Sequence, residues 1–281
     1  MKGKICMVTG ATSGIGEVTA RTLAQMGATV IVVGRSSEKS ATTVEHIRQQ
    51  TGNPTVEFML ADLSSQKEIR RLAQQFRSRY QHLHLLVNNA GGLFTARQQS
   101  VDGIEMTFAL NHLGYFLLTN LLLDTLKASA PARIVSVAAS AHRLVRGVNF
   151  DDLQGQARYS GLQAYAQSKL CNLLFTYELA RRLEGTGVTV NALHPGVVAT
   201  RFGHNNRGLA GMLARLSNLI AISPERGART IIYLATFSGV EGVTGQYFVN
   251  KKKAPSSPAS LDRTSAIRLW RVSEAMTGLS A

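Results

Sequence analysis

Short apolar runs rich in β-branched residues alternate with helical patterns along most of this 281-residue chain. Each run is typical of a buried strand, and each intervening segment has the spacing of a helix. This alternation predicts βαβ units with right-handed crossovers, and so a doubly wound (Rossmann) α/β fold whose mostly parallel sheet is covered by helices on both faces. We expect seven strands, at residues 5–8, 29–33, 56–60, 83–87, 133–138, 188–193 and 246–249.

The helical patterns fall between these strands and after the last one. Neither an internal repeat nor a second set of strand and helix signals is visible, so we expect residues 1–281 to form a single domain. Residues 143–160 and 201–222 interrupt the alternation and are interpreted as insertions on the substrate side of the sheet. Helices are expected at 18–26, 37–50, 66–80, 101–129, 162–183, 223–237 and 263–276.

The charge, the cysteines and the apolar runs of the sequence indicate which kinds of ligand and location to expect. The formal net charge is +14, but apart from residues 251–253 the basic side chains are scattered, which favours a solvated surface and an anionic cofactor over nucleic acid. Cys6 and Cys171 offer neither a disulfide framework nor a metal-binding pattern, so we expect no metal. The sequence contains no run of about 18 apolar residues. We therefore expect a cytoplasmic protein without a transmembrane segment.

A glycine-rich turn follows the first expected strand and opens the first expected helix. Residues 9–16 read TGATSGIG, where Gly10 permits a tight turn, Gly14 lets backbone approach a pyrophosphate and Gly16 allows close helix–strand packing. The N–H groups and dipole of a helix N-terminus favour a phosphate there. The context favours a dinucleotide site over a purely structural turn. The residues expected to bind the cofactor here are Gly10, Thr12, Ser13, Gly14, Ile15 and Gly16.

The second expected strand ends in a basic residue, where an NAD site carries an acidic one. Arg35 suits a ribose 2′-phosphate, with Ser36 and Lys39 assisting, so we expect NADP(H) as the cofactor. The alternative is a surface arginine at a strand end. Asp62 and Leu63 follow the third strand and are expected beside the adenine, a role compatible with capping of the next helix by Asp62.

Tyr165 and Lys169 stand four residues apart on an expected helix, so their side chains share one face. A nearby cation stabilises a phenolate, and we expect Lys169 and an oxidised nicotinamide together to lower the pKa of Tyr165. Tyr165 would then serve as an acid/base near neutral pH. This spacing alone is a weak pattern, and its place after the fifth strand of a Rossmann-like unit strengthens it.

Together these motifs resemble the short-chain dehydrogenase/reductase superfamily over essentially the whole chain. Further motifs of the superfamily are NNAG at 88–91, Asn111, YAQSK at 165–169, and Pro195-Gly196 with Thr200. Finer features resemble the retinol-dehydrogenase-like branch. They are residues 97–111, NFDDLQ at 149–154, residues 168–183 and 187–198, and LWRVS at 269–273.

The resemblance implies roles for individual residues. Asn111 would hold a water in a proton relay with Lys169, Tyr165 would exchange a proton with the substrate oxygen, and Lys169 would also bind the nicotinamide ribose. Val198 and Thr200 would fix the carboxamide of the nicotinamide. Asn88 would support the sheet, and further cofactor contacts are implied at Asn89, Ala90, Gly91, Pro195 and Gly196.

The chain departs from the family at one catalytic position. The family places a serine just after the fifth strand, where this sequence has Ala139, with Ser140 one residue later. Neighbours in an extended chain point to opposite faces. Three interpretations stay open: Ser140 takes over after a local rearrangement, Ala139 is an engineered substitution that traps a bound complex, or the protein works poorly without the hydroxyl. A non-catalytic NADP(H)-binding protein is the alternative to an enzyme, although Tyr165, Lys169 and Asn111 are intact.

The substrate side carries apolar side chains. Leu93 and Phe94 follow the fourth strand and are expected at the mouth of the site, together with Ala139 and Ser140. Residues 202–222 have one apolar helical face, interpreted either as lid packing or as the wall of a lipophilic pocket. We expect a small hydrophobic carbonyl or alcohol as substrate. Relatives associate through residues near 111–129 and 162–183, so a homodimer or homotetramer stays open.

Overall fold

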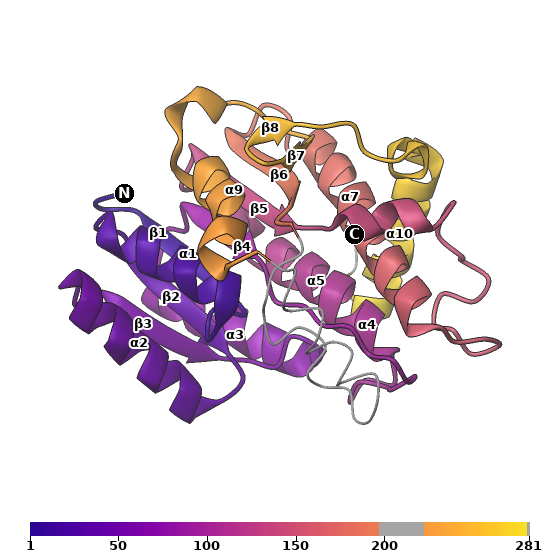
Figure 1. Cartoon of the computed structure of the whole chain (residues 1–281), viewed down its shortest axis with the longest axis horizontal. Coiled ribbons are helices and arrows are strands. Elements are labelled where there is room, and N and C mark those ends of the chain that lie inside the picture. Colours follow the sequence, from indigo (N-terminus) through magenta and orange to yellow (C-terminus); the bar gives the residue numbers. More distant parts are fainter. Residues whose placement is uncertain (197–221, 280–281) are drawn as a thin grey trace.

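A twisted sheet forms the centre of the computed structural model, which describes residues 1–196 and 222–279 (Figure 1). Within these residues the sheet has eight strands in the order β3-β2-β1-β4-β5-β6-β7-β8, and every neighbouring pair is parallel except β7 with β8. The order reverses between β1 and β4, which is where a doubly wound fold opens a crevice for a ligand. The strands are β1 Ile5–Thr9, β2 Thr29–Gly34, β3 Val56–Leu60, β4 Leu85–Asn88, β5 Ala132–Val137, β6 Val188–His194, β7 Gln246–Val249 and β8 Lys252–Lys253.

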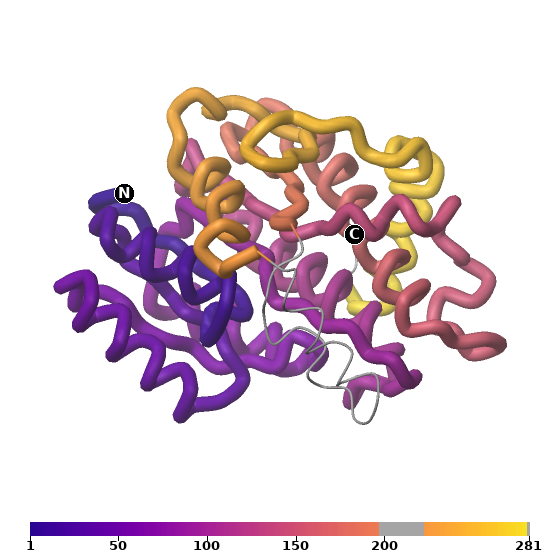
Figure 2. Tube along the Cα trace, viewed as in Figure 1, coloured from indigo at the N-terminus to yellow at the C-terminus, as the bar shows by residue number. Residues whose placement is uncertain are grey.

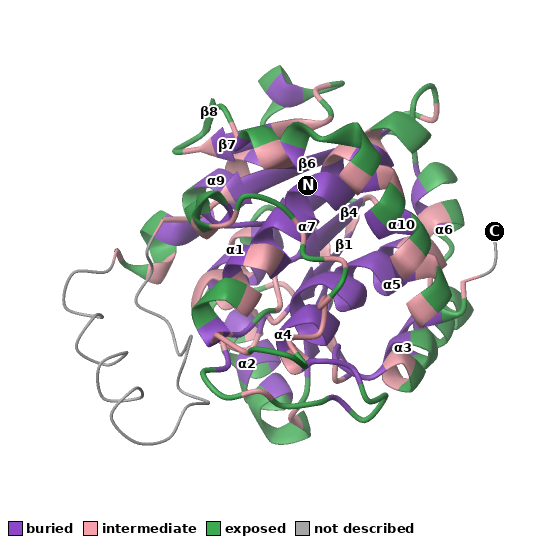
Figure 3. Cartoon of the chain, turned by 90° about the vertical axis from the view of Figure 1, so that its right-hand side faces the viewer, coloured by how far each residue is buried: buried purple, intermediate pink, exposed green. Residues whose placement is uncertain are grey.

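Helices cover both faces of the sheet, as the predicted doubly wound fold requires (Figures 1 and 3). One apolar core lies between the sheet and α1, α2 and α9, and a second lies between the sheet and α3, α5 and α7. Helix α10 packs against α7. The helices are α1 Gly14–Gln25, α2 Ser37–Thr51, α3 Gln66–Arg79, α4 Met106–Phe108, α5 Gly114–Leu121, α6 Leu123–Lys127, α7 Gly161–Arg182, α9 Pro224–Thr236 and α10 Arg263–Thr277.

The prediction of seven strands is wrong by one. Strand β8 pairs antiparallel with β7 through a tight hairpin, in which Asn250 and Lys251 have positive φ angles of 49° and 64°. Positive φ at both central residues is typical of a type I′ turn. The basic run at 251–253 therefore lies on a sheet edge, where lysines oppose pairing with a second chain.

The helix expected at 101–129 is also corrected. It begins at Met106, where the buried carboxylate of Glu105 accepts hydrogen bonds from the N–H groups of Thr107 (2.9 Å) and Phe108 (2.7 Å). A π-helical turn, Ala109–Leu113, then separates α4 from α5. Such turns are rare and occur mostly at functional sites.

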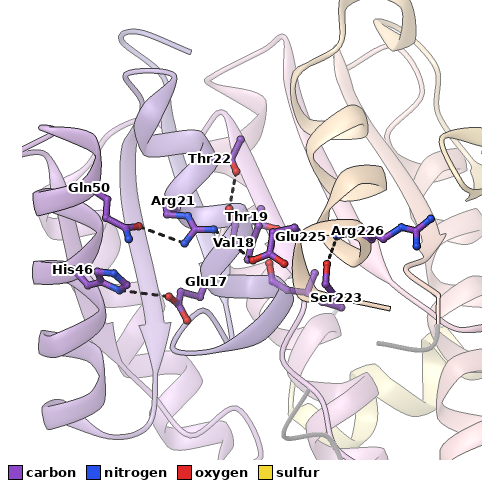
Figure 4. Close-up of polar contacts among 11 residues, drawn as sticks. Glu17, Val18, Thr19, Arg21, Thr22, His46, Gln50, Ser223, Glu225 and Arg226 are labelled. Carbon is purple, nitrogen blue, oxygen red and sulfur yellow. Dashed lines mark hydrogen bonds and ion pairs between the residues drawn. The ribbon is translucent and has the colours of Figure 1, made fainter. Parts of the chain in front are cut away.

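Polar contacts fix α1 between its two neighbouring helices (Figure 4). Arg21 donates to Gln50 of α2 (3.4 Å) and lies 3.8 Å from the carboxylate of Glu225 on α9. Glu17 and His46 approach to 3.8 Å on the α2 side. These surface contacts are individually weak, but together they set the orientation of the helix whose N-terminus faces the site.

The path of the chain brings the carboxyl ends of β1, β4, β5 and β6 to one edge of the sheet (Figure 2). Asn88 of β4 aligns with Ser136 of β5, and Val137 aligns with Leu193 of β6. Residues that directly follow these strands therefore meet. Across the described ranges, every helix is too short or too polar to cross a lipid bilayer.

Candidate active site

A cavity of about 970 Å³ opens at this edge of the sheet. Its wall comes from the turns after β1, β2, β3, β4, β5 and β6, and from α7. It brings together most of the residues predicted from the sequence, although they are spread over nearly 190 positions of the chain. The predicted residues that line it are Gly10, Thr12, Ser13, Ile15, Gly16, Arg35, Ser36, Asp62, Leu63, Asn89, Ala90, Gly91, Ala139, Ser140, Tyr165, Lys169, Pro195 and Gly196.

The glycine-rich turn forms one end of the cavity. Gly10 has a φ of 64°, and a Cβ on Gly16 would lie 2.4 Å from the Gly10 carbonyl oxygen, so a side chain at residue 16 would push the turn open. Ser13 precedes α1 in an extended conformation and makes no side-chain cap. The first N–H groups of α1 are therefore directed to the cavity without a capping side chain, as an anion site requires. Gly14 begins α1 with a φ of 59° and is not part of the cavity wall.

Thr9 and Asn89 join the turn after β1 to the loop after β4. The Thr9 hydroxyl accepts hydrogen bonds from the N–H groups of Asn89 (2.8 Å) and Ala90 (3.1 Å) and donates to the Val87 carbonyl (3.1 Å). The Asn89 side-chain amide donates to the carbonyl oxygens of Thr9 (2.7 Å) and Gly10 (3.3 Å). The structure thus adds a role for Thr9 that the sequence analysis missed.

The basic residue after β2 lies beside the glycine-rich turn, because a Cβ on the preceding Gly34 would lie 2.5 Å from the Thr12 side chain. Arg35 is largely exposed, and its guanidinium lies 3.9 Å from the carboxylate of Asp62. Ser36 caps α2 by accepting from the N–H of Lys39, whose side chain also lines the cavity. Asp62 does not cap the next helix: that cap is Ser65, and Asp62 instead accepts from the N–H and hydroxyl of Ser64.

Tyr165 and Lys169 project from the first half of α7 into the cavity. The Lys169 ammonium lies 5.5 Å from the centre of the Tyr165 ring and donates to the Val137 carbonyl at the end of β5 (3.1 Å). Lys169 is 3% exposed. The predicted pairing of a phenol with an amine on one helical face is therefore present.

Burial controls the charge of both groups. Desolvation raises the pKa of Tyr165 above its ordinary value of 10.0 and lowers the pKa of Lys169 to about 7. A low-dielectric environment disfavours the phenolate and the ammonium alike. The expected lowering of the Tyr165 pKa by Lys169 together with an oxidised nicotinamide stays a prediction for the cofactor complex.

Asn111 lies behind the cavity wall, on the π-helical turn. Its side-chain oxygen accepts from the N–H of Gly92 (2.8 Å), and its amide donates to the Gly92 carbonyl (2.9 Å) and to the Ser168 hydroxyl (3.0 Å). A Cβ on Gly91 would lie 3.1 Å from the Asn111 oxygen and 3.6 Å from the Lys169 ammonium. Asn111 thus fixes the loop after β4 against α7, next to the amine.

Ala139 and Ser140 form the wall after β5. Ala139 is 8% exposed with extended backbone (φ −160°, ψ 157°), and Ser140 is exposed and begins a short 3₁₀ turn. His142 holds this turn in place. Its Nε2 accepts from the N–H of Ser257 (3.1 Å), so Nδ1 carries the proton and donates to the Ala139 carbonyl (2.7 Å). The sequence analysis did not identify this anchoring histidine.

Other predictions about the wall are corrected or lie beyond the description. Leu93 and Phe94 are not part of the cavity wall, since the Phe94 ring packs into the core beside Gly92. Val198, Thr200 and residues 202–221 of the apolar segment predicted at 202–222 lie outside the described residues. No group of His, Cys, Asp and Glu suited to a metal occurs within residues 1–196 and 222–279. Lining residues that the sequence analysis missed are Val33, Gly34, Ala61, Gly92, Leu110, Val137, Ala138, Ala141 and His194.

Comparison with known proteins identifies the class to which this fold and site belong. The family model described as short chain dehydrogenase matches residues 4–208. Among solved structures, an uncharacterized protein from Mycobacterium paratuberculosis superposes with a TM-score of 0.78 at 32% identity, covering 99% of this chain and 94% of that one. The Pseudomonas aeruginosa RhlG/NADP active-site complex gives a TM-score of 0.70 at 29% identity, covering 88% and 94%. The chain belongs to the short-chain dehydrogenase family.

Curated relatives define the branch within that family. The chain is 44% identical to retinol dehydrogenase 12 from Mus musculus and 43% identical to retinol dehydrogenase 11 from Homo sapiens, in each case over 99% of this chain and 87% of the relative. The predicted resemblance to the retinol-dehydrogenase-like branch is confirmed. The protein is an oxidoreductase of alcohol or carbonyl substrates that uses a nicotinamide cofactor.

Proposed function

We propose that this protein transfers a hydride between NADP(H) and a lipophilic alcohol or carbonyl compound, with Tyr165 as the acid/base. One observation carries the proposal. The glycine-rich turn, Arg35, Tyr165 and Lys169 line a single cavity of about 970 Å³, so an anionic dinucleotide held at one end reaches the phenol at the other. The N-terminus of α1 supplies the N–H groups for its pyrophosphate.

Basic residues support NADP(H) over NAD(H). Arg35 and Lys39 lie in the wall beside the α2 N-terminus, where a ribose 2′-phosphate gains two cations and the Ser36 hydroxyl. Among the described residues of this wall, Asp62 is the single acidic group, and it already faces Arg35. Similar structures include a short chain dehydrogenase from Escherichia coli CFT073 complexed with NADPH, with a TM-score of 0.69.

Different residues of the chain have different roles in the proposed reaction. The bound nicotinamide supplies or accepts the hydride. Tyr165 donates its phenolic proton to a carbonyl oxygen, or removes the proton of an alcohol in the reverse direction. Lys169 stabilises the phenolate and positions the nicotinamide ribose. The Asn111 side chain is hydrogen-bonded to Gly92 and Ser168 and fixes the loop after β4 beside Lys169, where a relay water would lie.

Ala139 favours a second candidate function, an NADP(H)-binding protein with weak or no turnover. Its methyl group stands where the family places a hydroxyl, and the exposed Ser140 starts a different turn. The loss of one preorganised donor lowers turnover by about 10²–10³. This wall therefore supports a slow enzyme, or a protein that binds cofactor without turnover.

A cofactor titration combined with a turnover assay tests the proposal. We expect NADPH to bind more tightly than NADH, and we expect NADPH oxidation with retinal-like and other apolar carbonyl compounds. Tyr165→Phe should retain binding and lose turnover. Binding without measurable turnover would leave the second function, and a strict preference for small charged acids would refute the lipophilic substrate. Assembly into a homodimer or homotetramer and a cytoplasmic location stay predictions.

A further inference from the structure

Three buried polar side chains stand below the catalytic pair, and the proposed reaction does not use them. Tyr115, Ser136 and Asn172 are each 0% exposed. Within the described part of the chain, the Tyr115 hydroxyl and the Ser136 hydroxyl have no hydrogen-bond partner, whereas the Asn172 side chain approaches His112 at hydrogen-bonding range. Buried polar groups in native proteins nearly always bond to protein or to ordered water. The two hydroxyls therefore each require a partner.

Helical spacing places Tyr115 and Asn172 directly beneath the site. Tyr115 follows Asn111 by four residues on one helical stretch, and Asn172 follows Lys169 by three on α7. Residues three or four apart lie on the same helical face. Because α7 begins near the carboxyl edge of the sheet and runs back across it, Asn172 lies one turn deeper than the amine.

The register of the strands places Ser136 beside Tyr115 and Asn172. Ser136 of β5 aligns with Asn88 of β4, whose amide donates to the Thr119 hydroxyl on α5 (2.9 Å). Aligned residues of neighbouring strands point to the same face. The Ser136 side chain therefore faces the layer of α5 and α7, directly before Val137.

These groups surround one cation. The Lys169 ammonium and the Asn172 amide donate to the same Val137 carbonyl, at 3.1 Å and 3.5 Å, and the Tyr115 ring centre lies 5.9 Å from the ammonium. An ammonium has three N–H donors. Among the residues described, Val137 supplies the one hydrogen-bond acceptor that the structure gives it. The buried ammonium thus lacks hydrogen-bond acceptors at the place where the hydroxyls of Tyr115 and Ser136 also lack partners.

We propose that Tyr115 and Ser136 are positioning residues that hold an internal water below Lys169, beside Asn172, and that this water accepts a hydrogen bond from the ammonium. A buried water typically has two to four polar partners, and this shell offers them. A hydrogen bond to the charged form favours that form and opposes the effect of burial. The inference rests on the role proposed for Lys169.

The groups that surround Lys169 allow its titration to test this inference. Among the described residues, the titratable groups that face it are the phenols of Tyr165 and Tyr115. His112 is hydrogen-bonded to the Asn172 side chain and stays neutral, because burial lowers its pKa to about 3. Desolvation is the cause of the low Lys169 pKa, so a change in its hydrogen bonding acts without competition from a charged neighbour.

The experiment follows the titration of Lys169 by nuclear magnetic resonance of ¹³C-labelled lysine, with Lys169→Met assigning the signal. Tyr115→Phe and Ser136→Ala each delete one oxygen and keep the shape of the side chain. We expect each to lower the pKa of Lys169 by about half a pH unit. Asn172→Asp adds an anion and should raise it. Tyr80→Phe removes a phenolic oxygen from the end of α3 and should leave it unchanged.

An unchanged Lys169 titration in Tyr115→Phe and Ser136→Ala would overturn the proposal. A gain in stability in the same variants would show that the two hydroxyl oxygens have neither a water nor any other hydrogen-bond partner in the folded protein. If Asn172→Asp fails to fold, these two variants decide the matter alone. The readout does not depend on turnover. An inactive wild-type protein would therefore refute the proposed function without affecting this measurement.

Discussion

Restoring a hydroxyl at residue 139 should accelerate the reaction. Ala139 lies in the cavity wall with Tyr165, in extended backbone and 8% exposed, so the serine oxygen in Ala139→Ser would occupy an already buried position beside the phenol. One preorganised donor to a developing oxyanion changes turnover by about 10²–10³, or about 2.7–4 kcal/mol. We expect kcat to rise toward that range, and KM to change less, because the hydrogen bond strengthens in the transition state.

The assay is NADPH oxidation with an apolar aldehyde or ketone, at saturating cofactor, in wild type, Ala139→Ser, Ser140→Ala and the double variant. The rise should occur equally in the Ser140→Ala background, since Ser140 is exposed and starts the 3₁₀ turn. Tyr165→Phe in the Ala139→Ser protein is the control and should abolish the gain. Unchanged turnover in Ala139→Ser, with loss of activity in Ser140→Ala, would refute the reasoning and assign the role to Ser140.

Three further changes test other parts of the site. Arg35→Ala should weaken NADPH binding about 10- to 100-fold and leave NADH binding almost unchanged, because a charge-assisted hydrogen bond contributes about 1.5–3 kcal/mol; equal losses for both cofactors, measured by fluorescence titration, would contradict this. Gly16→Ala should abolish cofactor binding, since its Cβ would lie 2.4 Å from the Gly10 carbonyl oxygen, and calorimetry showing wild-type affinity would disprove it. Lys169→Met should be more stable than wild type near pH 7, and this advantage should shrink by about 1.4 kcal/mol per pH unit up to pH 9. Between the folded pKa of about 7 and the ordinary 10.5, the unfolded wild type binds a proton that the folded protein does not, so its stability rises with pH; parallel urea-unfolding curves across this range would exclude the assignment.

The fold was predictable because its signals are local and repeated. Apolar runs at each strand and the turn at 9–16 mark the βαβ units, and right-handed crossovers leave little freedom in their order. The short strand β8 was missed because its two lysines carry no apolar signal. The division of the helix after β4 was missed because the buried Glu105 cap and the π-helical turn depend on tertiary contacts.

The sequence predicted the site residues that belong to a motif with a known chemical role. It did not predict those whose position depends on packing in the folded chain. Tyr165 and Lys169 follow from helical spacing, and the phosphate turn follows from its glycines. Phe94 was misplaced because apolar residues near a strand end can face either the cavity or the core. The burial of Tyr165, which raises the pKa of its phenol, could not be predicted because the sequence shows the neighbouring amine but not the depth of burial.

A crystal structure with NADP(H) and an apolar carbonyl compound would show whether Tyr165 reaches the reacting oxygen beside a bound nicotinamide. We expect a pyrophosphate on the N-terminus of α1, and the Tyr165 hydroxyl within about 2.6–3.2 Å of the substrate oxygen. Lys169 should lie beside the nicotinamide ribose. A dinucleotide bound away from residues 10–16, or a reacting oxygen beyond the reach of Tyr165, would refute the assignment of Tyr165 as the acid/base.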